Sequence, residues 1–216
     1  DGKTSMRWFD DYPAGKDEGN RDESVEDPDF PGMYLPFITD VKDYKKSYEL
    51  NDADINGYWN NVVIRTRRAE DMKKGWYPAF SAAVEFGSKV AVPSYTTGWY
   101  LPSVGQLYDI LRNLGKADIS ADTVKDFNGN GDLLVDASYC ADMITFLDSY
   151  IAKIPEAERD LFSESTGAVW SSSHSWTYFS NGGISYAARL VSFYAGISTI
   201  SYSTFGVADV RLVFAF

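Results

Sequence analysis

The C-terminal stretch AVWSSSHSWTYFSNGGISYAARLVSFYAGISTISYSTF, residues 168–205, carries the strongest signal for the fold class. Short runs rich in Val, Ile, Tyr, Phe, Ser and Thr are interrupted by Asn181-Gly182-Gly183 and by Ala195-Gly196. This pattern is typical of antiparallel strands joined by hairpins. Within 188–193, alternation places the odd-numbered residues on one face of a strand and the even-numbered residues on the other.

Three helices are expected upstream of this sheet. Good helix formers predict the first over 78–87, with Gly87 as its stop. Ser103 and Gln106 have the spacing of a capping box, so the second should begin at Ser103 and end near Gly115. A wide apolar stripe over 139–154, closed by Pro155, predicts the third. Helices that precede a sheet indicate an α+β domain rather than a doubly wound one.

The chain holds one cysteine, Cys140, which lies on the apolar stripe of the third expected helix. A single thiol excludes an internal disulfide and a cysteine-rich zinc cluster. No basic residue stands nearby in sequence to activate the thiol, so Cys140 is interpreted as a small buried hydrophobe.

The first 40 residues have a different composition. They contain eleven acids against four bases, with Gly and Pro scattered among them. Such a stretch predicts an acidic, irregular N-terminal arm, and the simplest interpretation is a solvated tail without function. Residues 41–216 are then expected to form a single domain, since 216 residues favour one domain over two.

The overall charge argues against two classes of partner. A net charge of -11 and a pI near 4.5 would repel a phosphate backbone, and no basic cluster interleaves with aromatic residues, so nucleic acid is not expected. No run approaches the ~20 apolar residues of a membrane span, so no transmembrane segment is expected in this chain. Because the sequence begins at Asp1, an export signal is expected to have been removed.

Three segments stand in a characteristic order: Trp99-Tyr100-Leu101-Pro102-Ser103, Val169-Trp170-Ser171-Ser172-Ser173, and Val210-Arg211-Leu212-Val213 near the end. Together they resemble the W-x-L-P-S, W-S-S and V-R-x-V signature of bacterial surface domains in the C-type lectin-like superfamily. The strand pattern A-x-x-V-x-F of that signature is matched by 188–193. The resemblance covers about residues 78–216.

This resemblance implies a C-type lectin-like fold, with two or three helices packed on a small antiparallel sheet and long irregular loops. The superfamily includes the variable proteins of diversity-generating retroelements, whose C-terminal codons are rewritten, and the formylglycine-generating enzymes. The sequence lacks the Glu-Pro-Asn and Trp-Asn-Asp triplets of calcium-dependent sugar binding. It also lacks the paired thiols of the formylglycine enzymes.

Residues 170–205 are the expected ligand-binding region. Arg189 is the single charged residue among these 36, where a chain that is 24% charged would place about eight or nine. The same span holds nine aromatic residues and ten serines, a composition resembling an antibody paratope. Residues in or beside the hairpins are the ligand-contact candidates: His174, Trp176, Tyr178, Asn181, Tyr194, Ser198, Tyr202 and Phe205.

About half of this region must instead fill a core, because an ordinary sheet buries one face. Trp170, Phe193, Val213 and Phe216 are the residues predicted to be core. In the retroelement version of the hypothesis, rewritable codons fall at positions such as Ser173, His174, Tyr178, Tyr194 and Tyr202.

Catalysis by His174 is the alternative that the neighbouring serines suggest. The stretch, however, contains no acid, no Gly-x-Ser-x-Gly elbow and no helix that could supply an oxyanion hole. One His, one Cys and dispersed acids do not form a convergent catalytic set, so the chain is not expected to be an enzyme.

Two loops resemble the beginning of an EF-hand calcium loop. Asp126, Asn128, Asn130 and Asp132 supply oxygen side chains at positions 1, 3, 5 and 7, but Ala137 stands where a bidentate acid is needed. The segment Asp52–Gly57 repeats the start of the pattern and has Val63 at position 12. Both runs are also ordinary turn formers, so calcium is a possible cofactor and no other is expected.

The leading hypothesis is therefore a non-catalytic ligand-binding domain of the receptor or adhesin type, exported to a bacterial surface. Its ligand would be a protein or a glycan, bound by the Tyr/Ser-rich C-terminal surface. The alternative is a structural subunit of a surface appendage or an anchored stalk domain, whose apolar C-terminal strand would pair with another subunit.

Overall fold

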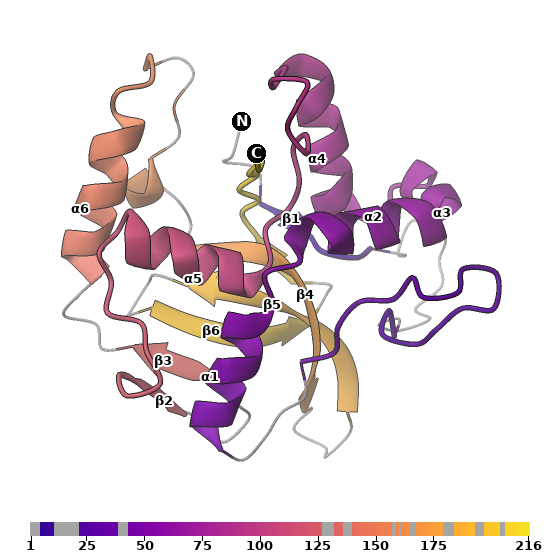
Figure 1. Cartoon of the computed structure of the whole chain (residues 1–216), viewed down its shortest axis with the longest axis horizontal. Helices are drawn as coiled ribbons and strands as arrows, with labels where there is room; N and C mark the ends of the chain where they lie inside the picture. The colour runs from indigo at the N-terminus through magenta and orange to yellow at the C-terminus, as the bar shows by residue number, and fades with distance from the viewer. Residues whose placement is uncertain are drawn as a thin grey trace.

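The computed structural model of the 216-residue chain describes residues 5–10, 22–38, 43–126, 132–135, 140–156, 159, 161–164, 167–178, 184–192, 197–203 and 206–216. Its elements confirm an α+β architecture: six α-helices accompany a five-stranded antiparallel sheet and a separate two-stranded pair. Two or three helices were expected. Figure 1 shows the helices arranged around the sheet.

The main sheet has the order β2-β3-β6-β5-β4, with every neighbouring pair antiparallel. The C-terminal region forms its larger part, as the alternating pattern predicted. The strands are β2 (Val124–Asp126), β3 (Leu133–Val135), β4 (Ala168–Tyr178), β5 (Ile184–Ser192) and β6 (Ile197–Ser203).

The three predicted helices are present. They are α4 (Pro78–Lys89), α5 (Val104–Asn113) and α6 (Cys140–Ile151). The first of them continues two residues past Gly87. At the start of α5 the backbone N–H of Ser103 donates to Gln106 Oε1 at 3.1 Å, one half of the predicted capping box. The side chain of Cys140 lies outside the described part of α6.

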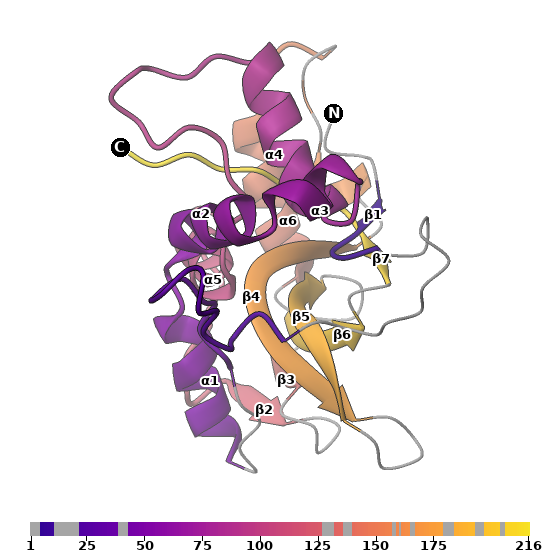
Figure 2. The ribbon, with the colours of Figure 1, turned by 90° about the vertical axis from the view of Figure 1, so that its right-hand side faces the viewer.

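Three helices were not predicted from the sequence. They are α1 (Tyr44–Ala53), α2 (Gly57–Arg67) and α3 (Ala69–Lys73). At the start of α1, the Asp43 carboxylate accepts a hydrogen bond from the Lys45 N–H at 3.0 Å, an ordinary N-cap. In Figure 2, α1, α2 and α5 all lie on the same side of β4.

Two core clusters use opposite faces of the sheet. Val169 and Val191 belong to a cluster with α1, α5 and α6. Ala188 and Leu190 belong to a second cluster, which contains apolar residues of α2 and α4. The odd and even residues of β5 therefore point to different cores, as alternation predicted.

The described residues of the first 40 pack onto the domain. Trp8, Phe9 and Leu35 are fully buried in the second cluster, and Ile38 in the first. Strand β1 (Met6–Arg7) pairs with β7 (Val207–Ala208). The interpretation as a solvated tail is therefore wrong for these residues, because apolar side chains between the acids supply part of the core. A boundary at residue 40 does not separate two packing units among the described residues.

Within the described part of the chain, no helix is both long enough and apolar enough to cross a lipid bilayer.

Candidate ligand-binding site

The three motifs that carried the family resemblance meet in space. Tyr100 and Val213 exchange both backbone hydrogen bonds, at 2.9 and 3.0 Å. The N–H of Ser172 donates to the carbonyl of Pro102 at 2.8 Å, and the N–H of Trp170 donates to the backbone carbonyl of Asp209 at 2.9 Å. We call this contact region, formed by 100–103, 170–173 and 209–213, the motif junction. It joins β4, the start of α5 and the C-terminal segment.

The serines of the motif junction face inward. Ser171, Ser172 and Ser173 are fully buried. They occupy an irregularity of β4, where the register shifts between Trp170 and His174. These three serines therefore do not belong to the Tyr/Ser-rich binding surface expected from the sequence, because each makes a hydrogen bond inside the protein.

Ser173 holds two distant elements together. Its hydroxyl donates to Asp54 Oδ2 at 2.6 Å and accepts from the Val104 N–H at 2.9 Å. Burial raises the pKa of the Asp54 carboxyl above its ordinary value of 3.8, while the hydrogen bonds from Ser173 and Asn56 oppose that rise. A substitution at Ser173 would break both bonds, so position 173 is not free to vary.

The same junction requires close backbone packing. A Cβ at position 105 would lie 2.7 Å from the Asp54 carbonyl oxygen, and one at position 57 would lie 2.6 Å from the Ser103 nitrogen. Both distances are too short for any side chain. Gly57 and Gly105 therefore allow α2 and α5 to approach their neighbours directly.

His174 is fully buried, which contradicts its prediction as a ligand contact. Its ring lies 5.5 Å from Phe37, 5.9 Å from Tyr186 and 6.2 Å from Trp8. Its backbone carbonyl accepts a hydrogen bond from the Ile38 N–H at 3.0 Å. His174 was misplaced because the N-terminal segment, which covers the outer edge of β4 here, was expected to be a tail.

These contacts also bear on the catalytic alternative. The Ser173 hydroxyl bonds to Asp54 and to the start of α5, whereas the described ring neighbours of His174 are aromatic. The Ser-His-Asp order of a triad, in which the imidazole bridges the hydroxyl and the carboxylate, is not formed by these residues.

Of the four residues predicted as core, Trp170 is confirmed, since it is fully buried and its indole N–H donates to the Met6 carbonyl at 2.7 Å. Val213 is half-buried. Phe216 is 87% exposed, so that prediction is wrong; the chain's last residue extends past the Thr97–Ala215 hydrogen bond. Phe193 lies outside the described residues.

The sheet register brings several predicted contact residues to one face. Trp176 pairs with Tyr186, Tyr178 with Ile184, and Ala188 with both His174 and Tyr202. Directly paired residues, and residues two apart along a strand, share a face. Trp176, Tyr178, Tyr186 and Tyr202 therefore belong to one face of β4, β5 and β6, which we call the aromatic face.

This face includes the last described pairs of β4 and β5. The described β4–β5 pairs run to Tyr178–Ile184, and the described β5–β6 pairs run to Ala187–Ser203. Figure 2 shows β4 and β5 running past β6 to the end of the sheet that lies away from α2, α3 and α4.

For several predicted contact residues the structure describes only the backbone, or nothing. Ser198 of β6 pairs with Ser192 of β5 and lies on the same face as Tyr202. The side chains of Trp176, Tyr178, Ser198 and Tyr202 are outside the described part of the structure. Asn181, Tyr194 and Phe205 lie outside the described residues entirely.

The described members of the two calcium-like loops have protein partners. Asp132 is buried, and its carboxylate lies 3.7 Å from the Arg189 guanidinium. Asp52 pairs with Arg112, and Asp54 bonds to Ser173. Asn128, Asn130 and the side chain of Asp126 lie outside the described part. Among the residues with described positions, no three His, Cys, Asp or Glu side chains gather in a way that could hold a metal ion.

Arg189, the single charge of 170–205, is buried on the other face of β5. Besides Asp132, it lies near the Tyr108 hydroxyl, which is 2.5 Å from the Thr199 hydroxyl. Burial raises the pKa of Tyr108 well above its ordinary range. Arg189 is therefore part of the domain interior and lies on the face of β5 opposite to the aromatic face.

An apolar groove of about 460 Å³ lies between α5 and the C-terminal segment. Ile110 and Leu114 line it from the helix, and Leu212, Val213 and Phe214 from the segment. Beside it, the Trp99 and Phe214 rings are 4.9 Å apart. The sequence pattern did not single out this groove, because its two sides are about 100 residues apart in the chain.

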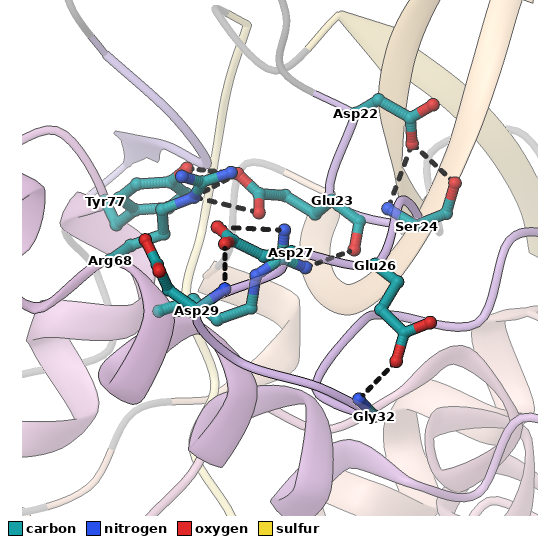
Figure 3. A network of polar contacts seen from close by, with 10 residues as sticks. Asp22, Glu23, Ser24, Glu26, Asp27, Asp29, Gly32, Arg68 and Tyr77 are labelled. Atoms are coloured by element: carbon teal, nitrogen blue, oxygen red, sulfur yellow. Dashed lines mark hydrogen bonds and ion pairs between the residues drawn. The ribbon is translucent and has the colours of Figure 1, made fainter.

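The acidic segment 22–38 is anchored by a buried carboxylate (Figure 3). Glu23 is fully buried, and both of its carboxylate oxygens lie 3.0 Å from Arg68 Nε. The Tyr77 hydroxyl also donates to Glu23 Oε1. The Glu23 carbonyl accepts from Arg67 at 3.2 Å and from the Leu35 N–H at 2.8 Å. The sequence predicted the charge of this segment. It did not predict the anchor, because the cations, Arg67 and Arg68, come from the end of α2 and the residue after it.

The comparisons with known proteins identify no family. No family model matches the chain, and no curated protein matches it. A solved structure similar to part of it is that of a fimbrial protein from Bacteroides ovatus ATCC 8483, with 18% identity and a TM-score of 0.43. The match covers 75% of this chain and 25% of that one, so the chain spans about a quarter of that protein's length. A similarity this distant assigns neither the fold nor the function.

Proposed function

We propose that this chain is a non-catalytic ligand-binding domain whose binding surface is the aromatic face. The observation that carries the proposal is the strand register, which gathers Trp176, Tyr178, Tyr186 and Tyr202 on one face of the sheet. Large, rigid aromatic side chains on a regular scaffold give contact area at a low entropic cost.

The motif junction gives this surface a rigid support. Ser172 and Ser173 fix β4 to the start of α5 and to Asp54, only a few residues before Trp176. His174 lies on this same face, since it pairs with Ala188, and its buried ring stacks on Tyr186 at 5.9 Å, so it holds Tyr186 from the side. Preorganised contact residues lose less entropy when a ligand binds.

The finer fold assignment is also a proposal. We infer a C-type lectin-like fold because the three motifs of the resemblance, more than 100 residues apart at their extremes, hydrogen bond to one another. On this proposal the domain acts outside a bacterial cell and takes a protein or a glycan. A more specific form of this proposal is a retroelement variable protein. Variation would then be confined to positions such as Tyr178, Tyr194 and Tyr202, because Ser173 and His174 are buried. A near-identical genomic repeat beside a reverse-transcriptase gene, differing where the template has adenine, is required by that form.

A triple substitution tests the binding surface. A glycan and protein array screened with the domain provides a ligand, and Trp176→Ala, Tyr178→Ala and Tyr202→Ala together should abolish its binding without loss of the cooperative melting transition. The matched control replaces one Trp and two Tyr that are exposed elsewhere: Trp59, Tyr34 and Tyr150. The proposal fails if the first variant binds as the wild type does, or if both variants lose binding equally.

A second candidate function is a structural subunit of a surface appendage. The apolar groove along Leu212, Val213 and Phe214, with Phe216 87% exposed beyond it, would suit pairing with a strand of a second copy. Light scattering at high protein concentration distinguishes the two. Assembly that Phe214→Asp and Phe216→Asp abolish would favour the subunit, and a monomer would exclude self-pairing through this groove.

A further inference from the structure

The aromatic face continues a side of the sheet that is core further along the strands. On β5, Ala188 and Leu190 belong to the second core cluster and are buried. Tyr186 is the next residue of β5 on that same face, and it is half-buried. On β4, the fully buried His174 pairs with Ala188. Tyr186 therefore stands where the buried part of this face ends.

Rings from three segments of the chain meet at this boundary. The His174 ring stacks on Tyr186 at 5.9 Å and on Trp8 at 6.2 Å, with interplanar angles of 18° and 26°. The Phe37 ring meets both His174 and Tyr186 edge-on, at 5.5 and 6.4 Å. Stacked and edge-to-face arrangements are the favourable geometries for aromatic pairs. We call Trp8, Phe37 and His174 the ring support of Tyr186.

The ring support is fixed to the rest of the domain. Trp8 is fully buried, and its indole N–H donates to the Ser171 carbonyl at 2.9 Å. Phe37 and His174 form a parallel β-bridge. The Ile38 N–H donates to the His174 carbonyl at 3.0 Å. Each of the three rings is therefore held by backbone or core contacts of its own.

Two of the three supporting rings come from the N-terminal part of the chain. Trp8 directly follows β1, and Phe37 lies near the end of the segment 22–38, whereas His174 belongs to β4. A half-buried side chain without fixed neighbours keeps several rotamers, and it loses that freedom when a ligand binds. The N-terminal rings therefore lower the entropic cost of binding at Tyr186.

We infer that Tyr186 is the anchor residue of the aromatic face, and that the segments 5–10 and 22–38 belong to the binding site because Trp8 and Phe37 position it. Residues that dominate binding energy are often Trp, Tyr or Arg in well-packed surroundings. Trp8 and Phe37 are positioning residues, which act on the ligand through His174 and Tyr186. The inference rests on the proposed function and adds to it a contact residue that the sequence did not single out.

Phe37→Leu tests the positioning step, because leucine keeps an apolar side chain but removes the ring that meets His174 and Tyr186. When the variant is titrated over the glycan and protein array, half-saturation of the wild-type spots should need about fivefold more protein. Phe37→Tyr keeps the ring and should stay within about twofold of the wild type. The matched control is Phe86→Leu, since Phe86 is also half-buried but packs on Trp99. Equal weakening in the two leucine variants would overturn the inference.

A measurement without ligand tests the same step. The order parameter of the Tyr186 ring, obtained from carbon-13 relaxation, should fall in Phe37→Leu and stay unchanged in Phe86→Leu. A Tyr186 ring that is equally ordered in the wild type and in Phe37→Leu would overturn the positioning role, whatever the array shows.

The anchor role is tested at Tyr186 itself, and this test separates the inference from the proposed function. Tyr186→Ala should weaken binding to the array spots by at least about thirtyfold, whereas Tyr150→Ala, at an exposed tyrosine of α6, should leave it within about twofold. If Tyr186→Ala binds as the wild type does while the Trp176, Tyr178 and Tyr202 triple-alanine variant does not, the aromatic face binds and the anchor is wrong. If the triple variant binds as the wild type does, the proposed function is wrong and the inference falls with it.

Discussion

Replacing Ser173 by Ala should destabilise the domain by about 3 kcal/mol, because it removes two hydrogen bonds in a fully buried position. The lost bond to the Asp54 carboxylate contributes about 2 kcal/mol, and the Val104 N–H left without an acceptor costs about 1 kcal/mol. The free energy of unfolding is measured by urea denaturation followed by circular dichroism. The control is Ser149→Ala, an exposed serine whose hydroxyl bonds to the Phe146 carbonyl; it should change stability by less than about 0.5 kcal/mol.

A double-mutant cycle checks that the loss comes from the named pair. Ser173→Ala and Asp54→Ala should be non-additive by at least about 1 kcal/mol, since each removes the same bond. A Ser173→Ala variant as stable as the wild type would refute the buried position of this serine and reopen its assignment as a surface contact.

Three further predictions concern the same framework. Gly105→Ala should destabilise the fold by about 2 kcal/mol or more, because the new Cβ would lie 2.7 Å from the Asp54 carbonyl oxygen. Gly87→Ala, whose Cβ would lie 3.7 Å from the Trp99 ring, should be neutral or stabilising by about 0.5 kcal/mol. Equal melting temperatures of the two variants would contradict this. Glu23→Gln should lower the free energy of unfolding by about 3 kcal/mol, because the partly buried Arg68 would lose its carboxylate partner. The same change should speed amide hydrogen exchange in 22–38, and unchanged exchange would rule out the anchor. Because the pKa of Asp54 in the folded protein lies above 3.8, the folded state binds this proton more tightly than the unfolded state does. The free energy of unfolding of the wild type, relative to Asp54→Asn, should therefore fall as the pH rises from 3.8 through the raised pKa, and then level off. Parallel pH profiles of the two proteins would disprove the shift.

The parts of the fold that could be predicted are those written in local pattern. Helices α4, α5 and α6 have regular apolar spacing with recognisable ends, and β4, β5 and β6 have dense β-branched and aromatic residues. Helices α1 and α2 were missed because α1 is largely polar and α2 begins with Gly57 and contains adjacent valines. The Asp43 N-cap was the available signal for α1.

The site was harder to predict because its partners are distant in sequence. Ser173 and His174 looked like surface residues beside a hairpin, yet Asp54 and Phe37, more than 100 residues earlier, bury them. The charge of the first 40 residues concealed Trp8, Phe9 and Leu35, which are core. Alternation within β4 alone puts Trp176 and Tyr178 on one face. That Tyr202 shares this face follows only from the register of β4, β5 and β6.

Binding at the aromatic face is tested most directly by mapping amide chemical-shift changes while a ligand from the array is titrated into the isotope-labelled domain. We predict that the largest changes fall on 176–178, 184–186 and 202. Changes concentrated instead on Ile110, Leu114 and 212–214 would place binding in the groove and contradict the assignment of the aromatic face.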